Sequence, residues 1–541
     1  MHEPEQERRR WYRAQGWWPA ERLQDRYARV VQERPEGLAV VDDTGRELTH
    51  GALWNEAERL GQEFARHGVG KDDVIIILLP NCVEWQIAFV AILRAGAIPA
   101  NLPIRTDADT LRYVAELVGA RLVITAERHG ANPTGAMAHS AATSSQHKLD
   151  VLLVRDVDQY VWIDANGEAL PPRARVEHLD HIMFTSSTTG RPKAVMHSTD
   201  TLAALNIAFT ERFSLGPDRP IFMASPLGHS VGAIHGARLS LYNGAALVLQ
   251  SAWEPKAVLA MIAEYDCAFT AAATPFLKDL VDATWDRSEP KLAPMRWFLC
   301  GGAQVPPALM EVAQQQFPNT FITVLWGMTE GGLTTCLCDS PYHKVLNTAG
   351  VGLPGLELRI LDPDGQPLPA GEEGELAMRG PGVFTGYYGQ ADLYAASLTA
   401  DSFFRTGDLA KLDEDGYLRI TGRLKDLIIR GGVNISPVPI EDALASHPNV
   451  ASVAVVGFPD DRLGERICAV IVAQGEVPSL DALNDFVRSK GVPKYHCPEV
   501  LCVIGEMPMT PAGKIRKNEL RATVVQESQQ EAHASENGVG S

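Results

Sequence analysis

The stretch TSSTTGRPK, from Thr185 to Lys193, decides how this chain is interpreted. Apolar residues over His181–Phe184 predict a buried strand directly before it. Helically spaced apolar residues behind it predict a helix that Thr199 or Asp200 caps. A loop between a strand and a helix that combines hydroxyls, backbone donors and cations suits a polyphosphate. The GK[ST] ending of a Walker loop is missing, so an ordinary polar turn is the alternative reading of this loop alone.

Two further motifs follow in chain order. Leu299–Gln304 (LCGGAQ) ends an apolar run in two glycines, where a flat ring could approach the backbone closely. In the later sequence TVLWGMTE, Trp326 could stack on adenine and Thr329 could bond a phosphate oxygen. Glu330 in the same motif could hold Mg²⁺ as a hard oxygen ligand. A strand terminus is the plainer interpretation of this motif when it is taken by itself.

Two single side chains are also candidates. Asp408 follows a glycine in FRTGD, in a predicted turn, where its carboxylate could accept both ribose hydroxyls or could simply cap the turn. His229 lies in Phe222–Gly232 (FMASPLGHSVG) and could be a packed core histidine, which is the usual fate of a lone His.

In this order the motifs resemble those of the adenylate-forming superfamily, which contains acyl-CoA synthetases, luciferases and peptide-synthetase adenylation domains. The resemblance covers residues 10–520, and Lys514 in PMTPAGKIRK matches the superfamily's mobile catalytic lysine. It implies that TSSTTGRPK holds the β- and γ-phosphates of ATP. The implied ATP- and AMP-binding residues are Thr185, Ser186, Ser187, Thr188, Thr189, Gly190, Lys193, Gly301, Gly302, Ala303, Trp326, Gly327, Met328, Thr329, Glu330, Asp408, Arg423 and Lys514.

The resemblance also implies the other functional groups. Mg²⁺ is held by Glu330, the hinge between domains is Lys425, and a thiol reaches the acyl group beside His229, Gly431 and Gly432. The implied catalytic residues are Lys514, Glu330, Thr185 and His229.

Composition restricts the class of protein. A chain of 541 residues with 45% hydrophobic and 21% charged residues is an ordinary globular protein of two or more domains. Its formal charge of −18 argues against nucleic acid as a partner. The eight cysteines form no CxxC pair, which favours a reducing cytoplasm. We expect no signal peptide, and the most apolar window, Val74–Ala100, carries too many polar residues to span a membrane.

Helices and strands alternate along the first part of the chain. Continuous apolar strands between helices predict a parallel sheet covered on both faces, and so an α/β fold. The segment Gly130–His147, rich in Ala, Ser, Thr and His, is predicted to be a mobile surface loop. The aromatic stretch Arg10–Trp18 is interpreted as an N-terminal arm packed on the main body, and it resembles the opening of aryl-acid and cyclohexanecarboxylate ligases.

The predicted organisation is a large N-terminal domain with doubly covered sheets and a small mobile α+β C-terminal domain. Residues 1–424 form the first, which holds the ATP and acid sites, and residues 425–520 form the second, with the hinge at Lys425. Residues 521–541 are polar, with few large apolar side chains, and are predicted to be a disordered tail.

The implied reaction has two steps. A carboxylate and ATP give an acyl-adenylate and pyrophosphate, and a thiol then displaces AMP. We favour free coenzyme A as the thiol because no carrier domain is attached, which makes the protein an AMP-forming acid–thiol ligase. Transfer to a carrier-protein arm or to an amine, or a non-catalytic nucleotide-binding relative, are the alternatives; a homodimer is possible.

The expected acid is small or medium-sized, uncharged in its body, and alicyclic, aryl or short aliphatic. Amino-acid-activating relatives place an Asp in the segment that matches Leu227–Val231, whereas Phe222–Gly232 holds no carboxylate here. An unpartnered ammonium in that pocket would cost roughly several kcal/mol. Ala224 replaces the Asn of hydroxybenzoate activators, which disfavours a catechol acid.

Overall fold

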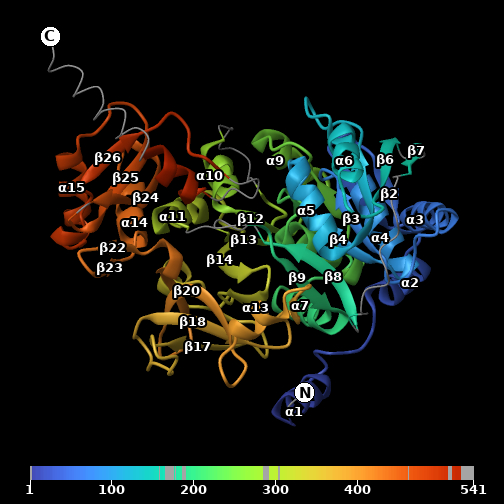
Figure 1. The fold of residues 1–541 in the computed structure, drawn as a ribbon, viewed down its shortest axis with the longest axis horizontal. Coiled ribbons are helices and arrows are strands. Elements are labelled where there is room, and N and C mark those ends of the chain that lie inside the picture. Colours follow the sequence, from blue (N-terminus) through green and yellow to red (C-terminus); the bar gives the residue numbers. More distant parts are fainter. Residues whose placement is uncertain are drawn as a thin grey trace.

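The structure is a computed structural model. It describes residues 3–156, 159–164, 176, 178–185, 191–283, 292–302, 305–460, 462–509 and 515–524. Two large sheets, one small antiparallel sheet and a C-terminal sheet make up the fold, with the C-terminal sheet at one end of the molecule (Figure 1). This is the predicted α/β architecture.

The first large sheet is parallel at its centre and antiparallel at both edges. In spatial order its strands are β16 (Val351–Gly352), β15 (Gly331–Thr335), β14 (Phe321–Met328), β13 (Trp297–Gly301), β12 (Phe269–Ala273), β10 (Ile221–Met223), β11 (Leu247–Leu249), β1 (Leu38–Asp42) and β2 (Glu47–Thr49). Parallel strands end at one edge of a sheet, so the motifs that follow β10, β12 and β13 are brought together there.

The second large sheet has the same plan. Its strands are β19 (Gly386–Tyr387), β9 (Ala194–Ser198), β8 (Leu179–Phe184), β4 (Ile98–Asn101), β3 (Val74–Leu78), β5 (Ala120–Ala126), β6 (Asp150–Asp156) and β7 (Gln159–Ile163). The predicted strand before TSSTTGRPK is therefore β8, which pairs with β9 on the other side of that loop.

Helices cover these sheets. They are α2 (Leu23–Glu33), α3 (His50–Arg66), α4 (Val83–Ala95), α5 (Ala108–Val118), α6 (Thr134–Thr143), α7 (Thr199–Arg212), the π-helix η1 (Gly232–Arg238), α8 (Leu239–Asn243), α9 (Pro255–Glu264), α10 (Thr274–Asp282), α11 (Pro307–Gln316) and α12 (Tyr342–Asn347). The cap of α7 is Ser198, whose hydroxyl accepts from the backbone of Thr201, so the expected cap at Thr199 or Asp200 was one or two residues late.

Both faces of the parallel sheets are buried, as predicted. On β3, Ile75 and Ile77 join one apolar cluster while Ile76 joins another on the opposite face. The same alternation separates Phe269 from Ala272 on β12. A strand with side chains in two cores reads as a continuous apolar run, which is what the sequence shows.

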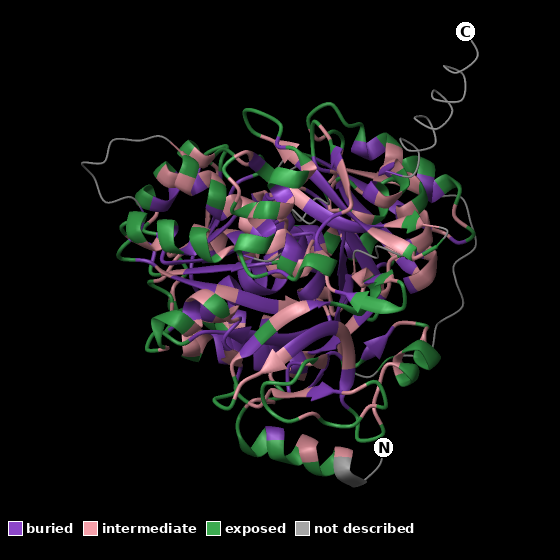
Figure 2. Cartoon of the chain, turned by 90° about the vertical axis from the view of Figure 1, so that its left-hand side faces the viewer, coloured by how far each residue is buried: buried purple, intermediate pink, exposed green. Residues whose placement is uncertain are grey.

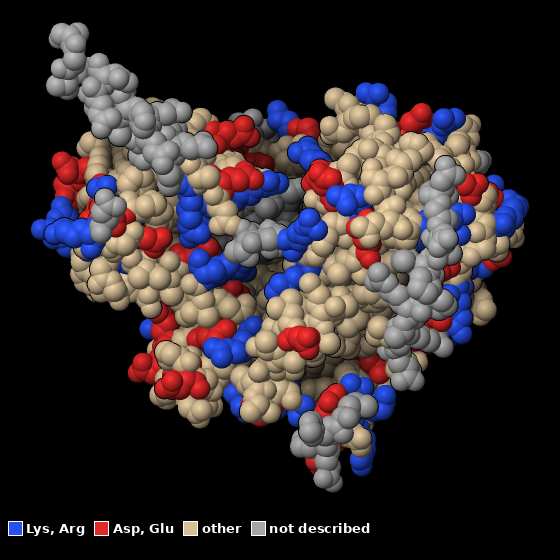
Figure 3. Space-filling view, in the orientation of Figure 1, with Lys and Arg blue, Asp and Glu red and all other residues tan. Residues whose placement is uncertain are grey.

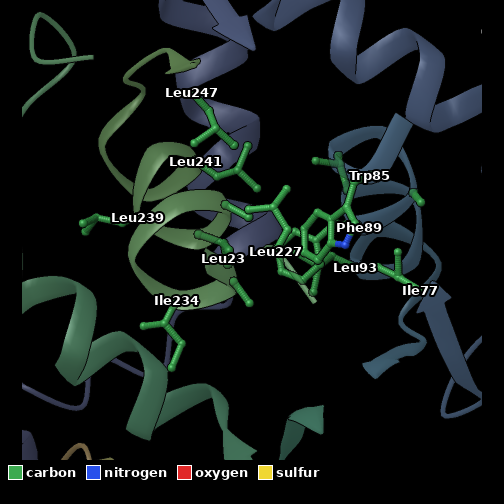
Figure 4. Packing of buried hydrophobic residues seen from close by; sticks show 14 of the residues in the cluster. Leu23, Ile77, Trp85, Phe89, Leu93, Leu227, Ile234, Leu239, Leu241 and Leu247 are labelled. Atoms are coloured by element: carbon green, nitrogen blue, oxygen red, sulfur yellow. The ribbon is translucent and has the colours of Figure 1, made fainter. Parts of the chain in front are cut away.

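The largest cluster fills the space between the two large sheets. Trp85, Phe89 and Leu93 of α4 lie beside Leu227 there (Figure 4). Buried positions concentrate in the sheets and in the helices between them, whereas the outer helices carry the exposed positions (Figure 2).

The segment Gly130–His147 contradicts the prediction of a loop. It contains α6, which packs against α5, β5 and β6. Ala138, Ala141 and Ala142 fall on one face of this helix and are buried. Alanine has the highest helix propensity and small side chains allow close packing, so the alanines that suggested low complexity are the contact face.

The small antiparallel sheet anchors the N-terminal arm. Its strands are β17 (Glu357–Leu361), β18 (Gly374–Arg379), β20 (Phe404–Leu412) and β21 (Leu418–Arg423), with α13 (Ala391–Ala396) beside it. After α1 (Glu3–Ala14), Trp17 packs against Gly355 and the Trp18 indole donates to the Pro381 carbonyl at 3.0 Å. Tyr12 is buried as well, so the prediction of a packed arm is confirmed.

The C-terminal domain is a five-stranded α+β unit. Its elements are η2 (Leu424–Asp426), β22 (Ile428–Arg430), β23 (Val433–Ile435), α14 (Val438–Ala445), β24 (Val450–Asp460), β25 (Gly464–Ala473), α15 (Leu480–Ser489), η3 (Lys494–His496) and β26 (Val500–Val503). The boundary at residue 424 and the hinge at Lys425 remain predictions; Lys425 lies in η2, the short turn between β21 and β22.

The predicted disordered tail begins too early. Residues 517–524 are helical, and Leu520 and Val524 are buried against the C-terminal sheet. The spacing of these two residues fits one face of a helix, which the polar residues around them obscured. Residues 525–541 lie outside the described residues.

The surface is mixed in charge despite the net charge of −18. Acidic and basic side chains are interspersed over the face shown in Figure 3. Within the described part of the chain, no helix is both long enough and apolar enough to cross a membrane.

Candidate active site

A pocket opens where the central strands of the first sheet end. It receives residues from the ends of β12 and β13, from the segment after β10, from η1, and from the turn between β14 and β15. Ligands in open α/β sheets bind at this edge. The lining residues are Leu205, Ser225, Pro226, His229, Ser230, Val231, Ile234, His235, Ala272, Ala273, Gly301, Gly302, Leu325, Gly327, Met328, Thr329, Gly331 and Leu333.

The pocket collects many of the predicted residues and leaves others outside it. The predicted residues that line it are His229, Gly301, Gly302, Gly327, Met328 and Thr329. Trp326, Glu330 and Asp408 lie beside it in the structure described below, whereas Gly431 and Gly432 form an exposed turn of the C-terminal domain with φ of 57° and 82°. Seven predicted residues lie outside the described residues: Ser186, Ser187, Thr188, Thr189, Gly190, Ala303 and Lys514.

The described ends of the TSSTTGRPK loop are tied together. The Thr185 backbone N–H donates to the Lys193 carbonyl at 3.1 Å, and the Lys193 N–H approaches the Thr185 hydroxyl at 3.4 Å. These bonds extend the ladder between β8 and β9 by one step. These bonds fix the backbone position of Lys193. Its ammonium nitrogen lies 5.0 Å from the centre of the Tyr387 ring.

Glu330 is connected to the same corner of the site. It is 5% exposed, and the Tyr387 hydroxyl donates to its Oε1 at 2.8 Å. Burial raises the pKa of Glu330 above its ordinary value, while the Tyr387 hydrogen bond and the charges of Lys193 and Arg423 oppose that rise. A carboxylate buried this deeply is stabilised by a cation placed against it.

The residues present fit Mg²⁺ in one particular way. No group of three or more His, Cys, Asp and Glu side chains that could hold a metal occurs among the described residues. Mg²⁺ usually takes one or two carboxylates, substrate phosphates and water. Glu330, next to the ends of the TSSTTGRPK loop, fits as the protein carboxylate of a site that nucleotide phosphates would complete.

Asp408 lies in strand β20, which corrects the expectation that it sits in a turn. The preceding Gly407 has a φ of 73°, which gives the local sequence its turn-like character. Asp408 pairs across the ladder with Arg423 of β21, whose Nε lies 2.8 Å from Oδ1. The Trp326 indole N–H donates to Oδ2 at 2.9 Å. An ionised carboxylate can accept about four hydrogen bonds, so capacity for ribose hydroxyls remains.

This contact predicts a specific loss in the variant Trp326→Phe. The variant keeps an aromatic ring and removes the N–H that orients Asp408. A hydrogen bond to a charged group contributes about 1.5–3 kcal/mol. If Asp408 binds the ribose, as the superfamily resemblance implies, the KM for ATP should rise about 10-fold or more. Initial rates of pyrophosphate release at varied ATP measure the change. Trp297→Phe is the matched control, because Trp297 lies at the end of β13 that is remote from the pocket. If Trp326→Phe raised the KM for the acid as much as the KM for ATP, the assignment would be contradicted.

Three contributors to the site were missed by the sequence interpretation. His197 bonds the Thr329 carbonyl through Nε2 at 2.8 Å and Thr201 through Nδ1 at 3.2 Å. The Ser230 and Thr329 hydroxyls lie 3.3 Å apart. Together with Tyr387, these residues contact the turn that carries Thr329 and Glu330. His197 and Tyr387 reach it from the paired strands β9 and β19, whereas Ser230 lies between β10 and η1.

The glycines of LCGGAQ have a structural reason in addition to the close approach of a flat ring, which stays a prediction. A Cβ on Gly301 would lie 2.3 Å from the Leu325 carbonyl oxygen of β14. Gly301 is therefore required by the neighbouring strand, whereas Gly302, with a φ of 83°, turns the chain at the pocket wall.

Comparisons with known proteins identify relatives of the chain. The profile of the AMP-binding enzyme family matches residues 27–388, and that of the AMP-binding enzyme C-terminal domain matches residues 439–514. The medium-chain fatty-acid–CoA ligase of Escherichia coli is 32% identical over 96% of this chain and 93% of its own length. The salicyl-AMP ligase / salicyl-S-ArCP synthetase of Mycobacterium tuberculosis is 30% identical over 94% and 91%.

A solved structure extends the likeness to three dimensions. The ATP-bound MatB from Rhodopseudomonas palustris superposes with a TM-score of 0.79 at 25% identity, over 93% of this chain and 99% of MatB. The likeness therefore spans both parts of the chain, and it confirms the predicted fold class.

Proposed function

The chain belongs to the AMP-binding enzyme family, and we propose that it joins a carboxylic acid to coenzyme A at the expense of ATP, with release of pyrophosphate and AMP. The observation that carries the proposal is the corner in which Lys193, Tyr387 and Glu330 meet beside the pocket. That corner offers cationic and metal-binding groups next to a space for an acid.

The first step forms the acyl-adenylate. A carboxylate oxygen of the acid attacks the α-phosphorus of ATP, and the bond to the leaving pyrophosphate breaks. Two anions approach each other in this step, so it needs positive charge that is already in place. Lys193 and, by the superfamily resemblance, Ser186–Gly190 and Lys514 would bind the phosphates, while Glu330 would hold Mg²⁺, which supplies further positive charge when bound.

The second step forms the thioester. The thiol sulfur attacks the acyl carbon, the bond to the AMP oxygen breaks, and the thiol proton is lost. His229 lines the pocket, which suits the proposed place between the acid and the thiol path. In the proposal, Gly431 and Gly432 line the path of the thiol, and they form an exposed turn of the C-terminal domain. Lys425 is the proposed hinge, which would bring this turn to the pocket.

The alternative acceptor is a carrier-protein arm or an amine. Its support is the relative whose activity includes a salicyl-S-ArCP synthetase. Free coenzyme A is preferred because the E. coli relative is a CoA ligase of 32% identity that this chain matches along 93% of its length.

The acid is proposed to be small or medium-sized and without charge in its body. Among the described residues that line the pocket, none is Asp or Glu, so an α-ammonium would lack a partner. Leu205, Ile234 and Leu333 give the wall an apolar character.

The test is pyrophosphate release with cyclohexanecarboxylate, benzoate, hexanoate and phenylalanine, followed by AMP release with and without coenzyme A. We expect at least one of the first three acids to be activated and phenylalanine to have the lowest kcat/KM. Adenylation without coenzyme A-dependent AMP release would favour the alternative acceptors. Preference for phenylalanine would contradict the proposed pocket, and a lack of release with every acid would contradict adenylation itself.

A further inference from the structure

His235 is an unusual residue of the pocket wall. It lies in the π-helix η1, a rare element in which one extra residue is held within a helical turn. The side chain is 3% exposed and lines the pocket. Its ring stacks on Phe209, with centroids 4.3 Å apart and planes inclined by 22°. The stacking occupies a ring face and leaves the ring edge, which carries both nitrogens, for other contacts.

The other buried histidines of the described chain are all hydrogen-bonded. His50 bonds Tyr27 and the Gly244 carbonyl, and His147 bonds Ser145 and the Ala120 carbonyl. His181 bonds Asn101 at 2.7 Å, and His197 bonds Thr201 and Thr329.

His235 is the exception. No described residue forms a hydrogen bond with either of its ring nitrogens. Neither nitrogen is among the fully enclosed side-chain atoms that lack a partner, a group that includes His181 Nδ1. Because His235 lines the pocket, its unbonded nitrogens are available there to a polar group on the ligand.

Two serines of the pocket are already engaged. The Ser225 hydroxyl donates to the Ala271 carbonyl at 3.0 Å, and that of Ser230 meets the Thr329 hydroxyl. On the η1 side of the pocket, His235 is flanked by Val231 and Ile234. The imidazole is therefore a polar group between apolar side chains of the pocket wall.

The imidazole is neutral at working pH. Burial lowers the pKa of His235 to about 3. A neutral imidazole offers one N–H donor and one nitrogen acceptor. It fits an uncharged oxygen, and it does not fit a second carboxylate, which would call for a cation.

We propose that His235 is a specificity-determining residue that hydrogen-bonds an uncharged oxygen on the body of the acid. The preferred substrates are then hydroxy or oxo carboxylic acids, a narrower class than the uncharged acids of the proposed function on which this inference rests. The arrangement binds the body of the acid, so it acts on the choice of substrate and leaves the nucleotide site unchanged.

The experiment compares matched acids on the full-length enzyme. Each plain acid is paired with its oxygenated forms: cyclohexanecarboxylate with its 3- and 4-hydroxy and oxo derivatives, benzoate with 3- and 4-hydroxybenzoate, and hexanoate with hydroxy and oxo groups at carbons 3 to 6. Pyrophosphate release gives kcat/KM for each. We expect at least one oxygenated acid to exceed its plain partner by about 10-fold or more, because a pocket group left unpaired discriminates against the plain acid.

Two variants assign the preference to His235. His235→Phe retains a ring for Phe209 and loses both nitrogens, so the preference should fall to about 1 while the KM for ATP stays the same. His235→Gln keeps a donor and an acceptor and should retain part of the preference. A merely structural role would lower kcat/KM for both members of a pair equally.

The outcomes separate the two proposals. If every plain acid has a kcat/KM equal to that of its oxygenated partners, the proposed role of His235 is wrong, whereas the proposed function still stands. A preference that survives unchanged in His235→Phe also overturns it. If no acid of any series releases pyrophosphate, the proposed function fails, and the inference about His235 fails with it.

Discussion

Glu330→Gln is expected to slow the pyrophosphate-releasing half-reaction about 10²–10³-fold, the loss typical when one preorganised charge-stabilising group is removed at a reacting phosphate. The variant keeps the size of the side chain and an oxygen that can accept from Tyr387. It removes the negative charge for which the Mg²⁺ site is proposed. Single-turnover formation of the acyl-adenylate measures the change.

The magnesium dependence should change with the rate. We expect the concentration of Mg²⁺ at half-maximal rate to rise in Glu330→Gln, because a neutral amide is a weaker ligand than a carboxylate. In the unaltered enzyme, the raised pKa of Glu330 means that its ionised form is lost at a higher pH than for an ordinary glutamate. The requirement for Mg²⁺ should therefore increase as the pH is lowered.

Two other variants serve as comparisons for Glu330→Gln, one with a smaller expected loss of rate and one with none. Tyr387→Phe removes only the hydrogen bond to Oε1 and should cost about 10-fold, in line with one hydrogen bond to a charged group. Glu254→Gln, at the cap of α9, leaves the site untouched and should keep full activity. A Glu330→Gln enzyme with unchanged adenylation and unchanged Mg²⁺ dependence would show that Glu330 is not the metal ligand.

Much of the fold could be predicted from local patterns. The helix α15, at Leu480–Ser489, can be recognised in the sequence because its amphipathic spacing is strong and Ser479 caps it. The end of α4 was marked by Gly96, which adopts the left-handed conformation. The helix α6 was missed because its contact face consists of alanines, which carry little hydrophobic contrast with the serines and threonines around them.

The site was predictable only where its residues share a motif. Thr329 and Glu330 were found together because they are neighbours in WGMTE. The partner of Glu330 is Tyr387, and that of Thr329 is His197, both contributed by other strands. Such pairs depend on which strands are adjacent, and a single sequence carries no record of that. His235 was missed for another reason: its significance lies in the absence of hydrogen bonds to its ring, which only the structure shows.

A buried ion pair holds the pocket wall to the second sheet. Arg238, the last residue of η1, lies 2.8 Å from Asp180 of β8, and the two side chains are 2% and 6% exposed. Burial lowers the pKa of the Arg238 guanidinium, and the charge and hydrogen bond of Asp180 oppose that effect. The pair therefore offsets part of the hydration that both ions lost when they were buried.

We expect Arg238→Met to lower the free energy of unfolding by about 3–5 kcal/mol, because it leaves the Asp180 carboxylate buried without its partner. Urea titration followed by tryptophan fluorescence measures this loss. Since η1 also carries His235, the KM for the acid should rise in the folded enzyme as well.

The double variant Arg238→Met, Asp180→Val decides whether the pair itself is responsible. It removes both charges, and it should recover most of the stability that Arg238→Met loses, since an apolar replacement of a buried ion pair is often neutral. Arg516→Ala, which breaks the exposed pair with Glu519, should change the free energy of unfolding by less than about 0.5 kcal/mol. If the double variant is as unstable as the sum of the two single variants, the two charges are not coupled, and η1 is held to β8 by apolar packing alone.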